Sequence, residues 1–200
     1  MSKLKEIGCE KIQLESVEYE YYESETDKKF VKKKIGNQPY LNPNFGYLQL
    51  SLMNNSRITV TTPEMLCLFG LQKGSSNYFS MSLQFTNYLE DPVMNQFYDF
   101  IQNSEFYHMS KLGINDKNIA LFQSQIKRDK KNKYDPNLSV KVPFSYNKFD
   151  VDIYSEDYSG VNMYYIQNFT KMRCDIYIDR IWKFNDTFVC KWKVSTVYLS

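Results

Sequence analysis

The chain has 200 residues, 42% of them hydrophobic, and a formal net charge of +2. This length predicts a single domain with a real core, and the near-balanced overall charge does not by itself call for a polyanion partner. The abundant Lys, Asn, Tyr and Phe are also what an A/T-rich genome encodes, so only the positions of these residues carry an argument.

The first half of the chain is punctuated by polar turns and shows several short alternating runs. A cationic segment over 28–34 reads either as a strand or as a loop. Thr62 and Pro63 predict the start of a short helix, with Thr62 as its cap. In chain order we expect strands over 12–22, 47–52 and 57–60, the helical turn over 64–69, and a half-buried strand over 78–85.

The second half opens on the strongest helix signal, with Asp91 as N-cap, Pro92 in the first turn and Gly113 past the end. Apolar and alternating runs then predict strands over 120–126 and 138–144 that form a hairpin with a basic tip, followed by an acidic turn over 150–158. Residues 174–198 form a hairpin that turns at Asn185 and Asp186. Many short strands with one substantial helix predict a mainly β fold, a closed or partly closed barrel.

Four widely separated cysteines, Cys9, Cys67, Cys174 and Cys190, form no CxxC pair. The single histidine, His108, does not complete a familiar zinc set. We therefore expect buried, reduced thiols and a histidine at the surface or at a helix end. The sequence shows no signal peptide and no apolar run of membrane-spanning length, which predicts an intracellular protein without a membrane partner.

Signatures of catalysis are missing from the sequence. It has no phosphate-binding GxxxxGKS or GxGxxG loop and no GxSxG elbow. The acidic residues Asp150, Asp152, Glu156 and Asp157 lack the glycine and the closing glutamate of a calcium loop, so we expect a solvated loop. The sequence thus predicts a protein that is not an enzyme and that needs no cofactor or metal.

Basic residues gather in two arms and on the terminal hairpin. Either arm alone is typical of a solvated loop, but two arms on one small β domain favour binding to phosphates, with Tyr134 able to stack on a base. The first arm contains Lys28, Lys29, Lys32, Lys33 and Lys34, and the second contains Lys127, Arg128, Lys130, Lys131, Lys133 and Tyr134.

On the terminal hairpin, cations alternate with apolar and aromatic residues at Arg180, Lys183, Lys191 and Lys193. This pattern suits a platform for single-stranded nucleic acid, and it also suits an ordinary half-buried hairpin. Any aromatic residue exposed beside a cation becomes a stacking candidate. Five aromatic residues lie on this hairpin or just before it, and most of them are expected in the core: Tyr164, Tyr165, Phe169, Trp182 and Trp192.

The order of motifs from about Tyr40 to Val197 resembles the OB-fold single-stranded DNA-binding proteins of large DNA viruses, and distantly those of tailed phages. The resemblance rests on TPEMLCLFGL (62–71), the helix DPVMNQFYDFIQNSEF (91–106), YDPNLSVKVP (134–143) and IDRIWKFNDTFVCKWKV (178–194). It implies a β-rich α+β fold, an OB-like, partly closed antiparallel barrel with one main helix and extended basic hairpins. The domain would cover residues 1–200, with 1–39 as an N-terminal strand and basic-arm extension.

The resemblance further implies that the second basic arm grips phosphates, that Tyr134 stacks, and that Lys141 extends the basic track. The phage proteins end in an acidic tail that recruits partners, whereas this sequence ends in Val-Tyr-Leu-Ser. The acidic stretch over 15–27 is the candidate substitute for that tail.

The sequence thus predicts a non-catalytic single-stranded DNA-binding protein of viral replication or recombination, located in the infected cell. RNA stays open as a ligand, as do replication proteins or self-association as further contacts. The alternative is a structural or protein-interaction module of a virus particle or replication complex, built as a β-sandwich or jelly roll. The first reading expects both basic arms on one face as the walls of a groove.

Overall fold

Two large sheets, a small two-stranded sheet and one long helix form the computed structural model, which describes residues 8–9, 12–25, 29–34, 36, 42–75, 78–155 and 161–199. The first sheet has the order β2-β1-β3-β15-β16-β8. Its strands are β1 (Val17–Ser24), β2 (Phe30–Lys33), β3 (Phe45–Leu52), β8 (Phe122–Gln123), β15 (Arg180–Phe184) and β16 (Thr187–Cys190).

The second sheet closes on itself. Strands β17, β10, β7, β5 and β14 pair in that order, and β14 pairs with β17 again. This ring makes the protein a β-rich α+β fold with an OB-like barrel, as the sequence predicted. The strands are β5 (Met65–Cys67), β7 (Phe79–Gln84), β10 (Asn137–Val142), β14 (Thr170–Ile178) and β17 (Lys193–Leu199), with β4 (Ile58–Thr61), β6 (Gln72–Lys73), β9 (Ile126–Lys127) and β13 (Asp152–Ser155) attached.

Alternation along the strands sets the core. In β7, Phe79, Met81 and Leu83 are buried while the residues between them are half-exposed. The same period of two continues in β10, where Leu138, Val140 and Val142 are buried. Because β7 and β10 pair antiparallel, these inward faces meet in the barrel interior.

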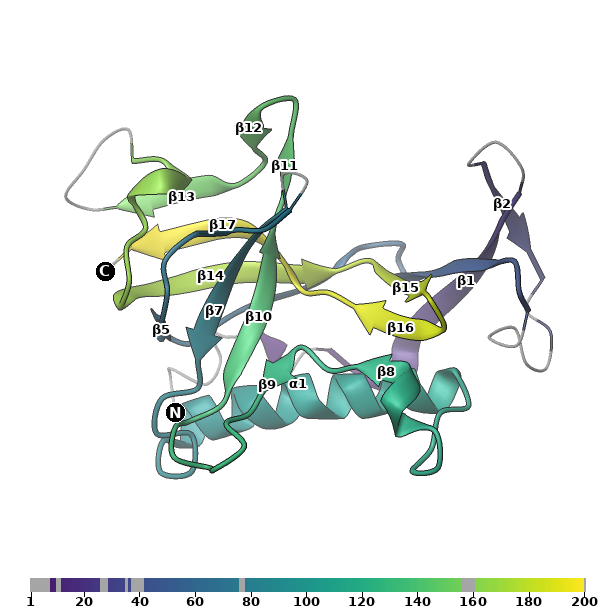
Figure 1. The fold of residues 1–200 in the computed structure, drawn as a ribbon, viewed down its shortest axis with the longest axis horizontal. Coiled ribbons are helices and arrows are strands. Elements are labelled where there is room, and N and C mark those ends of the chain that lie inside the picture. Colours follow the sequence, from purple (N-terminus) through teal and green to yellow (C-terminus); the bar gives the residue numbers. More distant parts are fainter. Residues whose placement is uncertain are drawn as a thin grey trace.

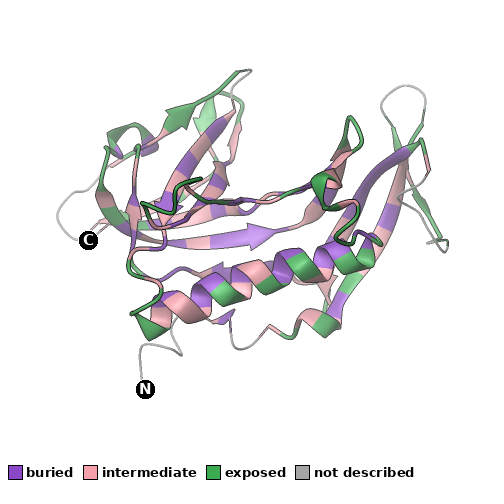
Figure 2. Ribbon diagram, turned by 60° about the horizontal axis from the view of Figure 1, so that its bottom comes forward, coloured by how far each residue is buried: buried purple, intermediate pink, exposed green. Residues whose placement is uncertain are grey.

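Helix α1 (Pro92–Lys111) packs along the barrel (Figure 1) and begins as the sequence predicted. The Asp91 carboxylate accepts from the backbone N–H groups of Val93 at 2.8 Å and Met94 at 3.3 Å. One face of the helix is buried and the opposite face is exposed (Figure 2). Gly113 adopts a positive φ of 70° just after the helix, where a side chain would be strained.

The C-terminal hairpin belongs to both sheets. Strands β15 and β16 turn at Asn185 and Asp186, both with positive φ, as predicted from the sequence. Before this hairpin the chain leaves β14 through Asp179, and after it the chain enters β17 through Lys191 and Trp192. The same pair of antiparallel segments thus passes from the barrel into the six-stranded sheet.

Several predictions from the sequence were wrong. Residues 64–69 contain strand β5 and a turn rather than a helix. Thr62 caps nothing there, because its hydroxyl donates to the Pro63 carbonyl and accepts from the Cys174 N–H. The first strand begins only at Val17, after the short 3-10 helix η3 (Leu14–Ser16). The predicted strand over 120–126 is split into η6 (Ile119–Leu121), β8 and β9.

His108 is only 1% exposed, so it lies at the helix end but not at the surface. The acidic segment predicted over 150–158 contains strand β13, and its last residues, 156–158, lie outside the described residues. The four cysteines are all buried thiols, as predicted. The helices in the described ranges lack the apolar length needed to cross a membrane.

Candidate nucleic-acid interface

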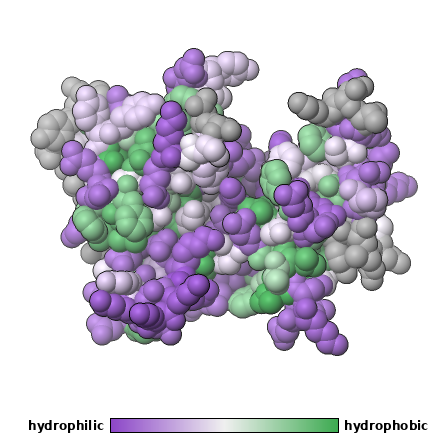
Figure 3. Space-filling view, in the orientation of Figure 1, coloured by the Kyte–Doolittle hydropathy of each residue, from purple (hydrophilic) through white to green (hydrophobic). Residues whose placement is uncertain are grey.

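A groove opens where the C-terminal hairpin passes between the sheets. It has a volume of about 440 Å³. The surface is notched on this side, between the lobe that carries β11 (Phe144–Ser145) and β12 (Lys148–Phe149) and the lobe that carries β1 and β2 (Figure 3). We call it the lysine groove, and its lining is Tyr78, Lys141, Asp179, Arg180, Trp182, Phe184, Val189, Lys191 and Lys193.

Strand pairing brings three lysines of the groove together. Lys141 and Lys193 are partners in the parallel contact between β10 and β17, and the Lys141 N–H donates to the Trp192 carbonyl at 2.8 Å. The Lys191 Nζ donates to the Tyr78 hydroxyl at 3.1 Å and lies 4.3 Å from the centre of that ring. The Lys141 Nζ lies 5.9 Å from the same ring centre. Tyr78 is therefore flanked by two cations.

The charges of the groove are only partly balanced. Lys193 donates to both carboxylate oxygens of Asp179, at 2.7 and 2.8 Å. Burial lowers the pKa of Lys141, and the neighbouring charges of Lys193 and Lys191 lower it further. A bound anion would stabilise the charged form of Lys141, which burial and the neighbouring lysines destabilise. This end of the groove therefore suits a phosphate.

Aromatic rings continue the groove along β15. The Arg180 guanidinium lies 4.7 Å from the centre of the Tyr47 ring and 5.6 Å from that of Trp182, and its Nε donates to Gln49. The Tyr47 and Trp182 ring centres are 4.7 Å apart. Phe184 follows on the same side of β15 and is 61% exposed. The groove thus offers cations at one end and stacking surfaces at the other.

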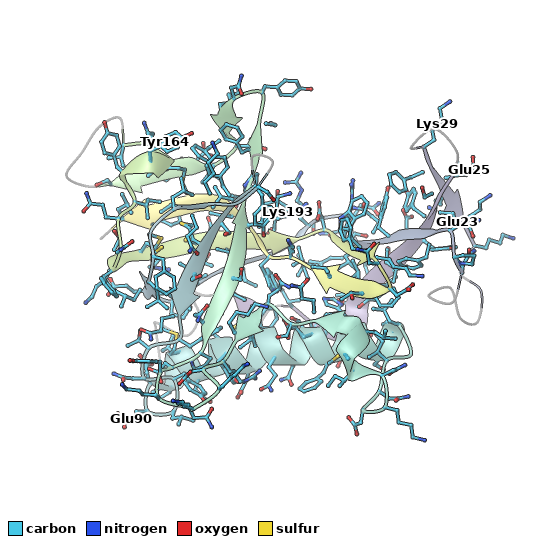
Figure 4. All side chains as sticks on the ribbon, in the orientation of Figure 1. Glu23, Glu25, Lys29, Glu90, Tyr164 and Lys193 are labelled. Carbon is cyan, nitrogen blue, oxygen red and sulfur yellow. The ribbon has the colours of Figure 1, made fainter. Side chains whose placement is uncertain are left out.

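The β1–β2 arm contributes a ring but few free charges. Phe30 packs edge-on against Trp182, with ring centres 5.7 Å apart. Lys32 pairs with Glu20, and Lys33 lies 3.5 Å from Glu25. Figure 4 shows Lys29 near Glu23 and Glu25 on this arm, while Lys193 lies in the centre of the molecule. Lys34 is exposed, and Lys28 lies outside the described residues.

The second basic arm is the loop between β9 and β10, next to the start of α1 (Figure 1). The Arg128 guanidinium donates to the Tyr98 hydroxyl at 2.5 Å, and the Lys127 Nζ donates to the Ser124 carbonyl. Lys130 and Lys131 are exposed. The Lys133 Nζ lies 5.2 Å from the centre of the exposed Tyr134 ring. This loop therefore presents cations beside an available aromatic face.

The two arms lie at opposite ends of the molecule (Figure 1), so they are not the facing walls of one groove. Four of the predicted site residues instead meet in the lysine groove: Lys141, Arg180, Lys191 and Lys193. Lys183 is on the alternate face of β15, where its side chain is mostly buried and pairs with Asp186 at 3.3 Å.

Of the five aromatic residues expected mostly in the core, Trp192 is buried and Trp182 is half-buried in the groove. Tyr164, Tyr165 and Phe169 are 65–68% exposed, which overturns the expectation for them. They lie in or near the short helix η7 (Met163–Tyr165), too short to cover its own rings.

Sequence reasoning missed Tyr78 and Asp179 of the lining, and also Tyr47, which is buried against Trp182 and Arg180. A signal existed for Tyr78, which shares the polar register of Ser80, Ser82 and Gln84. A large aromatic ring on an otherwise polar strand face indicates a surface that contacts another molecule. For Asp179 no local signal exists, because its role depends on the crossing between sheets.

Within the described ranges, no group of three or more His, Cys, Asp or Glu side chains is arranged to hold a metal ion.

No protein-family model matches the sequence, and no curated protein is detectably similar to it. Among solved structures, the fold is similar to that of the single-stranded DNA-binding protein from bacteriophage Enc34, with a TM-score of 0.50 and 9% sequence identity over 84% of this chain and 86% of that chain. A structure of the Enc34 protein in complex with ssDNA aligns with a TM-score of 0.49 and 10% identity over 84% and 92% of the two chains. At this identity the similarity concerns the fold, an OB-like barrel with one main helix.

Proposed function

We propose that the protein binds single-stranded DNA in the lysine groove, without catalysis. The observation that carries the proposal is the meeting of Lys141, Lys191 and Arg180 with the rings of Tyr78 and Trp182 in one groove. Cations that track phosphates beside rings that stack on bases are the general means of holding a single strand. The similarity in fold to the Enc34 protein supports the same reading.

Such binding has little sequence preference, because every base has a face to stack and every nucleotide has a phosphate. The protein would coat exposed strands during viral DNA replication or recombination, at the site of replication in the infected cell. The exposed cations of the β9–β10 loop, Lys130 and Lys131, would hold the same strand further along. RNA is the alternative ligand, since stacking and phosphate contacts do not read the 2′-hydroxyl.

The first test is a fluorescence-anisotropy titration of labelled oligo-dT at low and moderate salt, with duplex DNA and oligo-U as competitors. We expect salt-sensitive binding that duplex displaces poorly. Replacing Lys141 and Lys191 by glutamine should weaken binding and reduce the slope of log K against log salt by about 1.4, since each lost phosphate contact on a single strand accounts for about 0.7.

The matched control replaces the exposed Lys117 and Lys171 by glutamine, which changes the net charge equally outside the groove. Thermal melting confirms that both double variants fold. Absence of binding by the wild-type protein at low salt would reject the proposed function. Equal loss of binding in both variants would reject the groove as its site.

A protein-interaction role is the second candidate, favoured by the exposed rings of Tyr164, Tyr165 and Phe169. Tyrosine and phenylalanine are enriched in the centres of protein interfaces. Sedimentation velocity of the wild-type protein and of a Tyr165→Ser variant tests this role. A mass above that of one chain, reduced by the substitution, would support contact between copies.

A further inference from the structure

The β11–β12 hairpin projects from the end of β10 and carries an unusual turn. Phe144 pairs with Phe149, and Ser145 pairs with Lys148. The two turn residues, Tyr146 and Asn147, have positive φ values of 49° and 60°. This turn type favours Asn, Asp or Gly at both positions, and a bulky aromatic residue is an outlier there.

The base of the hairpin is held firmly. The Phe144 and Phe149 ring centres lie 4.9 Å apart, and each lies within 4.9 Å of the centre of the Phe79 ring in the barrel. The Asp150 N–H donates to the Pro143 carbonyl at 3.0 Å, which closes the hairpin. The tip is therefore presented by a packed support rather than by a loose loop.

Tyr146 takes no part in this packing. Its side chain is 96% exposed, the highest exposure of any large hydrophobic residue in the described part of the chain. Its backbone adopts a conformation that asparagine or glycine would hold at lower cost. A strained position occupied by a side chain that does not support the fold points to a contact with another molecule.

The hairpin directly follows strand β10, which contributes Lys141 to the lysine groove. Tyr146 follows Lys141 by five residues, so the two Cα atoms are at most about 17 Å apart. Two more cations lie on the hairpin or at its base. Lys148 is exposed on β12, and the Lys73 Nζ lies 5.8 Å from the centre of the Phe79 ring at the hairpin base. In Figure 1 the hairpin rises from the end of β10, beside the notch seen in Figure 3.

We propose that Tyr146 stacks on a base of the bound strand where the strand leaves the lysine groove, and that Lys148 contacts the adjoining phosphate. The inference rests on the proposed function and extends its binding site by one nucleotide-stacking position. It explains why a tyrosine occupies the turn, because a base stacks on an exposed ring that is fixed in place.

The test compares the wild-type protein with Tyr146→Asn on oligo-dT of increasing length. Asparagine suits the turn, so this variant should melt at the same temperature or higher. We expect equal affinity for oligonucleotides that fill only the groove. For longer oligonucleotides we expect the variant to lose about tenfold in affinity, in line with the loss of one stacked base. Tyr146→Phe should bind as the wild type does, and Tyr165→Asn serves as the control for an exposed tyrosine elsewhere.

The outcomes separate the two proposals. If the wild type binds short oligo-dT and Tyr146→Asn matches it at every length, the stacking role is wrong and the proposed function stands. If the wild type binds no oligonucleotide, both the proposed function and this inference are rejected. If Tyr146→Asn alters only the sedimentation of the free protein, the tyrosine contacts a second copy, and the inference is overturned.

Discussion

The two tryptophans of the chain have different surroundings. Trp192 is buried in the core, whereas Trp182 is half-buried between Arg180, Tyr47 and Phe30. Only Trp182 has a ring that a base can reach. Their sequence contexts, IWK and KWK, are nearly alike, so the difference was not predictable from the residues next to them.

Trp182 should therefore report binding. We expect its fluorescence to be quenched when oligo-dT is added, and we expect Trp182→Phe to lose the quenching while keeping most of the affinity. Trp182→Ala should cost about 1–3 kcal/mol of binding free energy, the usual contribution of one stacked base. Quenching that persists in Trp182→Phe would assign the signal to Trp192 and argue against contact with Trp182.

His108 provides a prediction about acid stability. Burial lowers its pKa from 6.5 to about 4, and its Nδ1 lies 3.0 Å from the Tyr19 hydroxyl. Between these pH values the unfolded chain binds a proton that the folded chain does not. The free energy of unfolding should therefore fall as the pH falls from 6.5 to 4, by about 3 kcal/mol in full.

Urea unfolding over this pH range measures the effect, with His108→Gln as the comparison. Burial raises the pKa of Glu105, so that residue contributes stability that grows as the pH falls and partly masks the effect of His108. The difference between the two proteins isolates the histidine. Parallel pH profiles would show that His108 does not titrate in this window.

At the level of elements, the best predictions came from strong local signals. The alternation in β7, the capped start of α1 and the Asn185–Asp186 turn are each determined by residues close in sequence. Strand β5 was missed because three residues are too few to show a period of two, and because its partners β7 and β14 are distant in sequence.

The site was predictable only in part for the same reason. Lys141 and Lys193 were named from their own strands, but their meeting depends on the parallel contact between β10 and β17. The sequence placed the groove walls in the two basic arms, which lie apart. No local pattern reveals where two sheets exchange strands.

Gly46 links β3 to the position of the first arm. A Cβ atom at this residue would lie 2.8 Å from the Phe30 ring, closer than real contacts allow. Gly46→Ala should therefore push Phe30 away from Tyr47 and Trp182, because a side-chain ring can move more readily than the backbone. We expect weaker binding to oligo-dT with a small loss of stability.

A double-mutant cycle checks this mechanism. Phe30→Ala should weaken binding to a similar degree, and adding Gly46→Ala to Phe30→Ala should cause little further loss. Fully additive losses would mean that Gly46 acts through something other than the Phe30 ring.

Across the whole molecule, the basic residues occupy a central groove and a separate end. The β9–β10 loop, which carries Lys130 and Lys131, lies beside the start of α1 and at the other end of the molecule from β2 (Figure 1). A strand that touches both the groove and this loop must be longer than one that fills the groove alone. The dependence of affinity on oligonucleotide length therefore measures how far the binding surface extends.

Replacing Lys130 and Lys131 by glutamate should weaken binding to long oligo-dT and flatten its salt dependence, while short oligonucleotides that fill only the groove bind as before. Anisotropy titrations over a length series at two salt concentrations measure both effects. Equal binding at every length would remove the loop from the interface.

The ion pair at the crossing between the sheets has a consequence for the whole binding reaction. Lys193 donates to both carboxylate oxygens of Asp179, so a carboxylate of the protein itself, rather than an ion from solution, already neutralises one cation of the groove. A phosphate that takes over Lys193 releases a tethered carboxylate instead of a free ion from solution. The number of cations in the groove would then overestimate the number of ions released on binding. The affinity for DNA would therefore fall less steeply with salt than the number of lysines predicts.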